Sequence, residues 1–203
     1  MGSSVVICIP AYNEEKNIKR VVDASKIYGD VVVFNNNSKD NTEHIARKCG
    51  ATIIPVIDQG YDCVIESISN FFRYSEYSKL IIVDGDGEVG LDYIEKSINL
   101  LDKYDAVIGS RPSIKRYGEK VICLLFKYLY KVDDIYCGFK CFTRIGINPK
   151  YVKKSFGTSI FNKGTSIFNQ PVTLVTREDK SKLGDGLYLN YQLFISGIRG
   201  LFL

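Results

Sequence analysis

The chain has 203 residues, a net charge of +4, 45% hydrophobic residues and 25% charged residues, which is the composition of an ordinary globular protein. These values exclude a disordered tail, a collagen-like chain and a coiled coil, and the length favours one domain with one sizeable core. No apolar run approaches the ~20 residues that span a bilayer. No basic segment precedes the first apolar run, so we expect neither a membrane span nor a secretory signal.

Charge is distributed unevenly along the chain. Residues 1–100 carry 10 Lys/Arg and 15 Asp/Glu, whereas residues 101–203 carry 17 Lys/Arg and 8 Asp/Glu. An acidic first half suits a cation, and a basic second half suits an anionic partner such as phosphate, a membrane surface or nucleic acid. A solvated surface that is merely asymmetric would give the same counts.

The cysteines argue against a zinc site. The six are Cys8, Cys49, Cys63, Cys123, Cys137 and Cys141. None forms a CxxC pair, and the only histidine, His44, is distant in sequence from Cys137 and Cys141. We therefore expect free thiols and a reduced, cytosolic compartment.

The first half alternates strand and helix signals. The expected strands are residues 5–9, 31–34, 52–56, 80–83 and 106–109, and the expected helices are residues 13–28, 40–50, 61–72 and 93–101. Continuous apolar strands that alternate with helices predict an α/β fold with a parallel sheet covered on both faces. Right-handed crossovers would place the strand carboxyl ends at one edge, where ligands bind in such sheets. The polar loops 10–14, 35–40 and 84–88 are expected at that edge.

The second half is less regular. We expect a helix over residues 119–132, strands over 136–143 and 171–176, and a helix over 186–196. The first of these helices is very apolar, with Lys120, Lys127 and Lys131 at helical spacing along one side. Such a helix either lies against a membrane or a lipid, or simply packs in the core; the sequence leaves both interpretations open.

An acidic cluster follows the fourth expected strand. Asp84, Asp86 and Glu88 alternate with glycines. Three carboxylates so close together repel one another, and a bound cation would neutralise them. Oxygen ligands favour Mg²⁺ or Mn²⁺, and Mg²⁺ usually takes one or two carboxylates together with substrate phosphates. The cluster therefore predicts a metal that holds a diphosphate, as in a nucleotide-sugar.

Seven segments in order resemble the family 2 glycosyltransferases of GT-A fold, and most closely the polyprenyl-phosphate hexose synthases. The segments are residues 6–15, 32–42, 59–61, 82–88, 107–111, 134–140 and 170–172, the last followed by Arg177 and residues 181–183. The resemblance covers about residues 5–190. It implies a single domain over residues 1–203, a Rossmann-like three-layer sandwich around a mostly parallel sheet. Residues 1–110 would bind the nucleotide-sugar and residues 111–203 the acceptor.

The resemblance also implies roles for individual residues. The nucleotide-sugar would contact Pro10, Ala11, Tyr12, Glu14, Asn35, Asn36, Asp84, Gly85 and Asp86. The metal, Mg²⁺ or Mn²⁺, would be held by Asp84, Asp86 and Glu88. The acceptor would contact Arg111, Arg177, Ser181 and Lys182. Catalysis would rest on Asp134, Arg111 and Asp86. The family usually has two aspartates where this chain has Asn35 and Asn36, so the base, in UDP or GDP, stays open.

The function that the resemblance implies is inverting transfer of a hexose from a UDP- or GDP-hexose to a polyprenyl phosphate. An anionic acceptor needs positioning, by Arg111 and Arg177, more than deprotonation. A hydroxyl acceptor, for instance a glycan in cell-surface polysaccharide synthesis, would need a general base, for which Asp134 is the candidate.

Three further classes fit the sequence to different degrees. A nucleotidyltransferase would carry a basic glycine-rich loop after the first strand, which residues 10–14 lack. A degenerate, non-catalytic nucleotide-sugar-binding protein is compatible with Asn35 and Asn36. A nucleic-acid partner is not expected, because no basic patch is interleaved with aromatic residues. The expected location is the cytoplasm, with peripheral association at the cytoplasmic face of the membrane.

Overall fold

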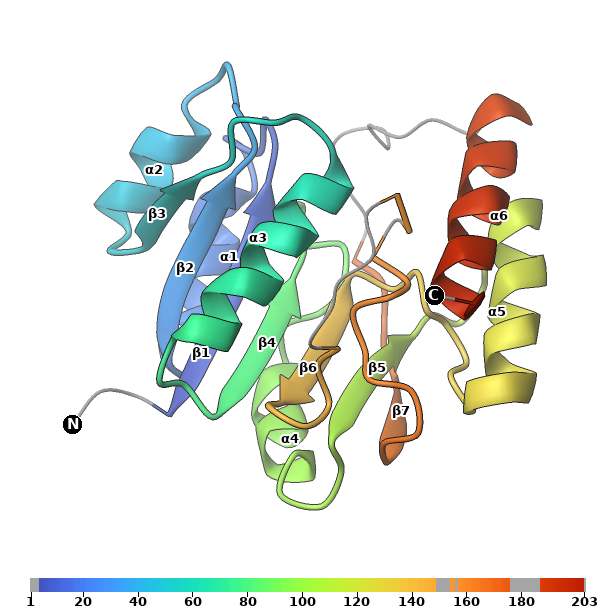
Figure 1. The fold of residues 1–203 in the computed structure, drawn as a ribbon. Coiled ribbons are helices and arrows are strands. Elements are labelled where there is room, and N and C mark those ends of the chain that lie inside the picture. Colours follow the sequence, from blue (N-terminus) through green and yellow to red (C-terminus); the bar gives the residue numbers. More distant parts are fainter. Residues whose placement is uncertain (1–3, 149–153, 156, 176–186, 203) are drawn as a thin grey trace.

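The computed structural model describes residues 4–148, 154–155, 157–175 and 187–202. Strands and helices alternate through the first half of the chain (Figure 1). The strands are β1 (Val5–Ala11), β2 (Asp30–Asn35), β3 (Thr52–Pro55), β4 (Lys79–Val83), β5 (Ala106–Ser110), β6 (Phe139–Thr143) and β7 (Ile167–Pro171). The helices are α1 (Ile18–Ser25), α2 (Thr42–Lys48), α3 (Tyr61–Tyr74), α4 (Tyr93–Leu100), α5 (Tyr117–Tyr130) and α6 (Leu187–Phe202).

The seven described strands form one sheet in the order β3-β2-β1-β4-β6-β5-β7. β1 pairs in parallel with β2 and β4, β2 with β3, and β5 with β7. β6 is antiparallel to both of its neighbours, β4 and β5. The prediction of a mostly parallel sheet in an α/β fold is confirmed. The assignment of residues 1–110 to the donor and 111–203 to the acceptor stays a prediction.

Two hydrophobic clusters cover the two faces of the sheet. One joins the sheet to α3, α5 and α6, through residues such as Phe72, Phe126 and Leu201. The other joins it to α1, α2 and α4, through residues such as Val21 and Ile94. Figure 1 shows the resulting three layers, with α3 on one face and α1 and α4 on the other. The three-layer sandwich is therefore also confirmed.

The strand that opens the chain is longer than predicted, and the first helix is shorter. β1 continues through Pro10 to Ala11 because its pairing with β2 continues that far. Pairing with β4 ends at Cys8, so the missing N–H of Pro10 interrupts no ladder on that side. The helix expected from residue 13 begins at Ile18. Asn13 has a left-handed backbone with φ of 54°, which a helix does not admit.

The strand predicted over residues 171–176 is wrong. The structure places β7 over Ile167–Pro171, and Thr176 lies outside the described residues. The apolar residues Val172 and Leu174 are nevertheless inward, against the cluster of α1 and α4. Leu174 makes only an isolated bridge to Val89. The apolar run therefore indicates burial, whereas the strand that pairs with β5 begins four residues earlier, at Ile167.

Three further elements have shifted boundaries. The strand predicted over 136–143 begins only at Phe139. The helix predicted over 119–132 spans Tyr117–Tyr130, and it ends because Lys131 adopts a left-handed backbone with φ of 62°. α6 runs through Leu187–Phe202, past the predicted end at residue 196. No helix among the described residues is long and apolar enough to cross a membrane.

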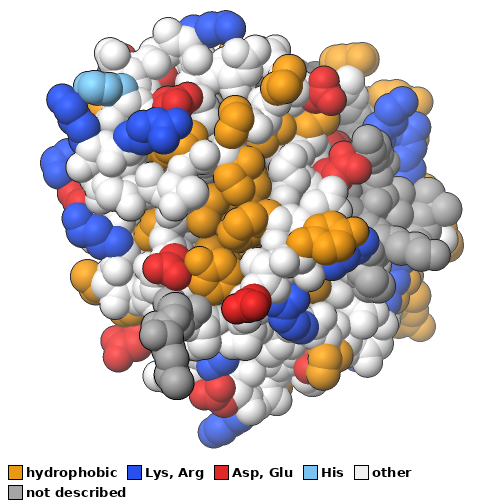
Figure 2. Space-filling model, turned by 60° about the vertical axis from the view of Figure 1, so that its left-hand side comes forward, with side chains coloured by type: hydrophobic (Ala, Val, Ile, Leu, Met, Phe, Trp, Pro, Cys, Tyr) orange, Lys and Arg blue, Asp and Glu red, His pale blue; other side chains and the backbone are white. Residues whose placement is uncertain are grey.

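The sheet has an open edge at β3, which pairs with β2 alone among the described strands. Figure 2 looks at the molecule with this side turned forward and shows hydrophobic side chains gathered in the middle of the face. Ile53 and Ile54 of β3 are half-buried rather than covered. All six cysteines are free thiols.

Candidate active site at the strand carboxyl ends

Three polar loops meet at the carboxyl ends of the neighbouring strands β1, β2 and β4. The backbone N–H of Asn36 donates to the carbonyl of Ala11 at 2.9 Å, and that of Gly85 donates to the carbonyl of Pro10 at 3.0 Å. A Cβ at Gly85 would press against the Pro10 carbonyl and against Ala11. Pro10 and Ala11 therefore lie between the asparagine loop and the acidic loop, at the centre of the predicted nucleotide site.

The loop after β1 is bonded to the loop after β2. The Asn13 N–H donates to Ser38 Oγ at 3.0 Å, the Lys39 N–H donates to Asn13 Oδ1 at 2.8 Å, and the Glu14 N–H donates to Thr42 Oγ1 at 2.7 Å. Glu14 is buried and accepts a hydrogen bond from Asn17 Nδ2 at 3.0 Å. Tyr12 is 42% exposed. This bracing holds the aromatic ring of Tyr12 at the surface, where an aromatic face can stack on a base.

The amides of Asn35 and Asn36 bond to the protein itself. Asn36 Nδ2 donates to the carbonyls of Asp58 at 2.8 Å and Val56 at 3.4 Å, while its Oδ1 accepts the N–H of Gly60 at 2.9 Å. Asn35 Nδ2 donates to Glu43 Oε2 at 3.0 Å. Both side chains therefore shape loops beside the site. Contact of either with a base stays a prediction.

The acidic loop leaves β4 with the side chains of Asp84, Asp86 and Glu88 partly buried. Asp86 Oδ1 accepts the N–H of Glu88 at 2.9 Å. Gly87 has a left-handed backbone with φ of 62°, and its carbonyl accepts a hydrogen bond from Arg20 Nη2 at 3.1 Å. The turn is therefore anchored to α1, and the loop that carries Asp84, Asp86 and Glu88 lies at the carboxyl end of β4.

The donor set of this loop fits a magnesium or manganese ion. It offers carboxylate oxygens alone, which are hard ligands suited to these cations. Within the part of the chain that the structure describes, no three His, Cys, Asp or Glu side chains gather closely enough to hold a metal by themselves. A metal here would therefore take one or two carboxylates, and diphosphate oxygens and water would complete its coordination, which is the usual arrangement for Mg²⁺.

A buried ion-pair network lies after β5. Arg111 Nε donates to Asp134 Oδ2 at 2.6 Å, and Arg111 Nη2 donates both to Asp134 Oδ1 and to Glu119 Oε2 at 2.9 Å. Arg116 Nη1 donates to Glu119 Oε1 at 2.7 Å. Asp134 is 1% exposed and Glu119 is 3% exposed. Although burial opposes the charge, the bonds to Asp134 and the charge of Glu119 raise the pKa of Arg111 above its ordinary value.

This network joins two residues that the sequence assigned to different roles. Arg111 was expected to grip an acceptor phosphate and Asp134 to act at the reacting centre, and the structure binds them to each other. Nε and Nη2 of Arg111 are engaged, and its Nη1 makes no hydrogen bond to a described residue. That nitrogen is the part of the guanidinium which can still reach an anion.

Sequence reasoning missed Glu119 and Arg116. Their signal was present: an Arg–Glu pair three residues apart at the start of an otherwise apolar helix. Three of the expected acceptor residues, Arg177, Ser181 and Lys182, lie outside the described residues.

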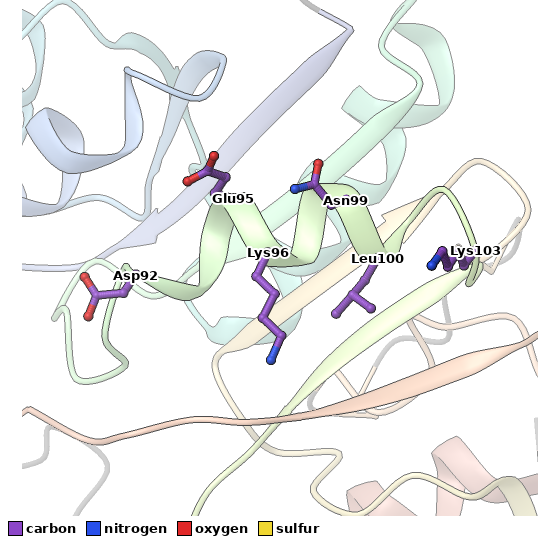
Figure 3. Close-up of a pocket in the computed structure, with 6 residues that line it drawn as sticks. All are labelled: Asp92, Glu95, Lys96, Asn99, Leu100 and Lys103. Carbon is purple, nitrogen blue, oxygen red and sulfur yellow. The ribbon is translucent and has the colours of Figure 1, made fainter.

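A surface hollow of about 460 Å³ lies elsewhere, along α4. Figure 3 shows the residues that line it, which are Asp92, Glu95, Lys96, Asn99, Leu100 and Lys103. Both signs of charge are present, and none of the predicted site residues is among them. The hollow has the mixed charge of a solvated helix face and lacks the convergent polar groups of a binding site.

Comparison with known proteins places this arrangement in a family. A family model described as glycosyl transferase family 2 matches residues 6–154. A dolichyl-phosphate hexose transferase of Haloferax volcanii is 29% identical over 154 residues, which cover 69% of this chain and 66% of that protein. A dolichyl-phosphate beta-glucosyltransferase of Trichomonas vaginalis is 26% identical over 173 residues, covering 67% of this chain but only half of the relative.

Solved structures of glucosyl-3-phosphoglycerate synthase from Mycobacterium tuberculosis are similar in fold. The complex with phosphoglyceric acid has a TM-score of 0.70 at 16% identity and covers 97% of this chain and 79% of that one. A complex of the same enzyme with Mn²⁺, UDP and phosphoglyceric acid has a TM-score of 0.69 at 15% identity. At these identities the likeness concerns the fold alone.

Proposed function

Since the chain belongs to glycosyl transferase family 2, we propose that this glycosyltransferase moves a hexose from a UDP- or GDP-hexose to a polyprenyl phosphate, with inversion at the anomeric carbon. The observation that carries the proposal is the convergence of three loops at the ends of β1, β2 and β4, with Asp84 and Asp86 in one of them. The names of the relatives from Haloferax volcanii and Trichomonas vaginalis support a lipid-phosphate acceptor.

In this proposal the donor lies across the loop ends. Tyr12 stacks on the base, and Pro10, Ala11 and Gly85 let the backbone approach the nucleotide closely. One or two of the carboxylates of Asp84, Asp86 and Glu88 would hold the divalent ion, which would stabilise the charge on the departing diphosphate. As the acceptor phosphate oxygen bonds to the anomeric carbon, the bond from that carbon to the diphosphate breaks, and the electron pair leaves with the nucleotide.

The acceptor side is assigned to the Arg111 network. A phosphate is already an anion, so it needs a fixed cation rather than a base. Asp134 and Glu119 orient the guanidinium of Arg111 through their ion pairs with it. The Nη1 atom of Arg111 then faces the acceptor. Within this scheme Asp134 is a positioning residue. Its burial and the three hydrogen bonds that it accepts from Arg111 argue against a role as a general base for a hydroxyl.

A lipid acceptor brings the protein to a membrane surface, and α5 offers a suitable face. Tyr117, Val121, Leu124 and Tyr128 follow one another at helical spacing and are all exposed. Lys120, Lys127 and Lys131 flank them. Exposed apolar and aromatic residues beside lysines are typical of helices that lie in the interface of an anionic membrane. We therefore propose peripheral association at the cytoplasmic face.

The decisive experiment offers one labelled donor at a time, UDP-glucose or GDP-mannose, with Mn²⁺ and several acceptors. A short-chain polyprenyl phosphate should be glycosylated, and the matching polyprenol should not. Asp86→Ala should lower the rate by about 10²–10³, as loss of a preorganised electrostatic group does. Product formed only on phosphoglycerate or on free sugars would move the assignment to a hydroxyl acceptor. Nucleotide binding without any turnover would indicate a binding protein.

A further inference from the structure

A lysine is buried at the centre of the sheet. Lys140 lies on β6 between its pairing partners Ile82 of β4 and Ile108 of β5, and it is 3% exposed. Its Nζ donates a hydrogen bond to the carbonyl of Cys137. No carboxylate among the described residues forms an ion pair with it. Burial of an ammonium group is costly unless opposite charges or hydrogen bonds compensate it. A buried lysine at this position therefore indicates a role beyond packing.

The pairing of β4 with β6 relates Lys140 to the acidic loop. Because Lys140 pairs with Ile82, continuing the antiparallel register by two residues sets Asp84 against Gly138, on the same face of the sheet as Lys140. Such diagonal neighbours are about 7–8 Å apart, within reach of a long side chain. A Cβ at Gly138 would overlap the carboxylate of Asp84. That carboxylate therefore lies over Gly138, beside the Cys137 carbonyl that Lys140 bonds.

The charges around Lys140 agree with this placement. Burial lowers the pKa of Lys140, and the negative charges of Asp84 and Asp134 oppose that shift, while Arg111 adds to it. The lysine thus lies between the acidic loop on β4 and the ion-pair network after β5.

We propose that Lys140 is a positioning residue that fixes the Asp84 carboxylate for the divalent cation and the nucleoside diphosphate. The proposal rests on the proposed function. Asp84 would otherwise turn away from the neighbouring carboxylates of Asp86 and Glu88, which repel it. Lys140 draws it back toward the Cys137–Gly138 segment, and the absence of a side chain at Gly138 leaves room for it there.

The test measures Mn²⁺-dependent binding of UDP and GDP by calorimetry. Lys140→Met keeps the length of the side chain and removes its charge. It should raise the Kd about 10-fold or more, as loss of a partner behind a metal ligand does, while the melting temperature stays the same or rises because a buried charge is gone. Lys79→Met is the matched control, since Lys79 is a shielded lysine that bonds Ile98 and Asp102 at the other end of β4. It should leave the Kd unchanged.

The same substitution in an Asp84→Asn background shows whether Lys140 acts through Asp84. There, Lys140→Met should have no further effect on the Kd. Full additivity of the two changes, or a wild-type Kd in Lys140→Met alone, would overturn the inference. Lys140→Gln replaces the methionine variant if that variant does not fold, with the same expectations.

Crystal structures without nucleotide separate this inference from the proposed function. In Lys140→Met the Asp84 carboxylate should leave its place over Gly138, whether or not the wild-type protein binds a nucleotide. An unmoved carboxylate would refute the role of Lys140. A wild-type protein that binds no nucleoside diphosphate with Mn²⁺ would instead refute the proposed function.

Discussion

Asn36 bonds through both ends of its amide to the turn that follows β3. The donors reach the carbonyls of Val56 and Asp58, and the oxygen accepts from Gly60. A carboxylate has no donor and could make only the last of these bonds. The amide at this position, which the resemblance had marked as a departure, is therefore explained by the loop it closes.

This explanation predicts the effect of restoring an acid. Asn36→Asp should lower the free energy of unfolding by about 1–3 kcal/mol, because the carbonyls of Val56 and Asp58 lose their donor and face a negative charge. Urea denaturation measures the loss. Asn37→Asp is the control, since Asn37 is exposed and accepts a hydrogen bond from Lys39 Nζ at 3.0 Å. Equal stability of the two variants would contradict the assigned role of Asn36.

The Arg111 network makes a second prediction at the residue scale. Arg111→Met leaves Asp134 and Glu119 buried without their shared cation, which should cost about 3–5 kcal/mol of unfolding free energy. Arg47→Met removes an exposed partner of Glu43, an ion pair of 2.9 Å at the surface, and should cost less than about 1 kcal/mol. Thermal or chemical unfolding of the two variants, Arg111→Met and Arg47→Met, measures the two losses of unfolding free energy. Similar losses would mean that the Arg111 network is no more than a surface ion pair.

At the scale of elements, the structure shows core packing for α5, whereas contact of this helix with a membrane stays a proposal. Ile122, Cys123 and Phe126 are buried against the sheet, whereas Leu124 and Tyr128 are exposed. α6 packs beside α5 (Figure 1), where the N–H of Gly118 donates to Asn190 Oδ1 at 3.2 Å. The helix therefore packs in the core on one face and keeps a second apolar face exposed.

The two faces of α5 should respond differently to substitution. Leu124→Asp together with Tyr128→Asp should abolish sedimentation with vesicles of anionic phospholipid and leave the melting temperature nearly unchanged, because both side chains are exposed. Phe126→Ala should instead destabilise the fold by about 3–5 kcal/mol. Vesicle binding that survives the double aspartate variant would remove α5 from the membrane proposal.

The strands of the second half show where element-level reasoning stops. The apolar patterns predict buried strands equally well over residues 139–143 and 106–109. No pattern of apolar residues indicates the direction of a strand or which strands lie beside it. β6 enters between β4 and β5 and runs against both. That insertion brings Lys140 and Gly138 beside the acidic loop, although more than fifty residues separate them from Asp84 in the chain.

At the scale of the whole molecule, the donor site needs β1, β2 and β4 side by side. Binding of a nucleoside diphosphate together with Mn²⁺ to the folded chain alone should raise its stability by mass action, by about 2.7 kcal/mol at one hundred times the Kd. For a chain of this length that corresponds to a rise of roughly 5–10 °C in melting temperature. Removal of the metal with EDTA, or Asp86→Ala, should abolish the rise. Melting that is indifferent to every common nucleoside diphosphate would contradict the donor site.

The sequence by itself determined the alternation of strands and helices, the sheet covered by helices on both faces, and the acidic loop at a strand end. Local patterns of residues are enough for these features, because burial and turn formation depend on residues that are close together along the chain. It also carried the resemblance to the family. Only the tertiary structure decided that Arg111 and Asp134 form one ion pair, that Asn36 closes a turn, and that β6, which carries Lys140, pairs with β4 beside the acidic loop. Those contacts join residues that are distant along the chain, and strand order and direction, which no local pattern encodes, bring them together.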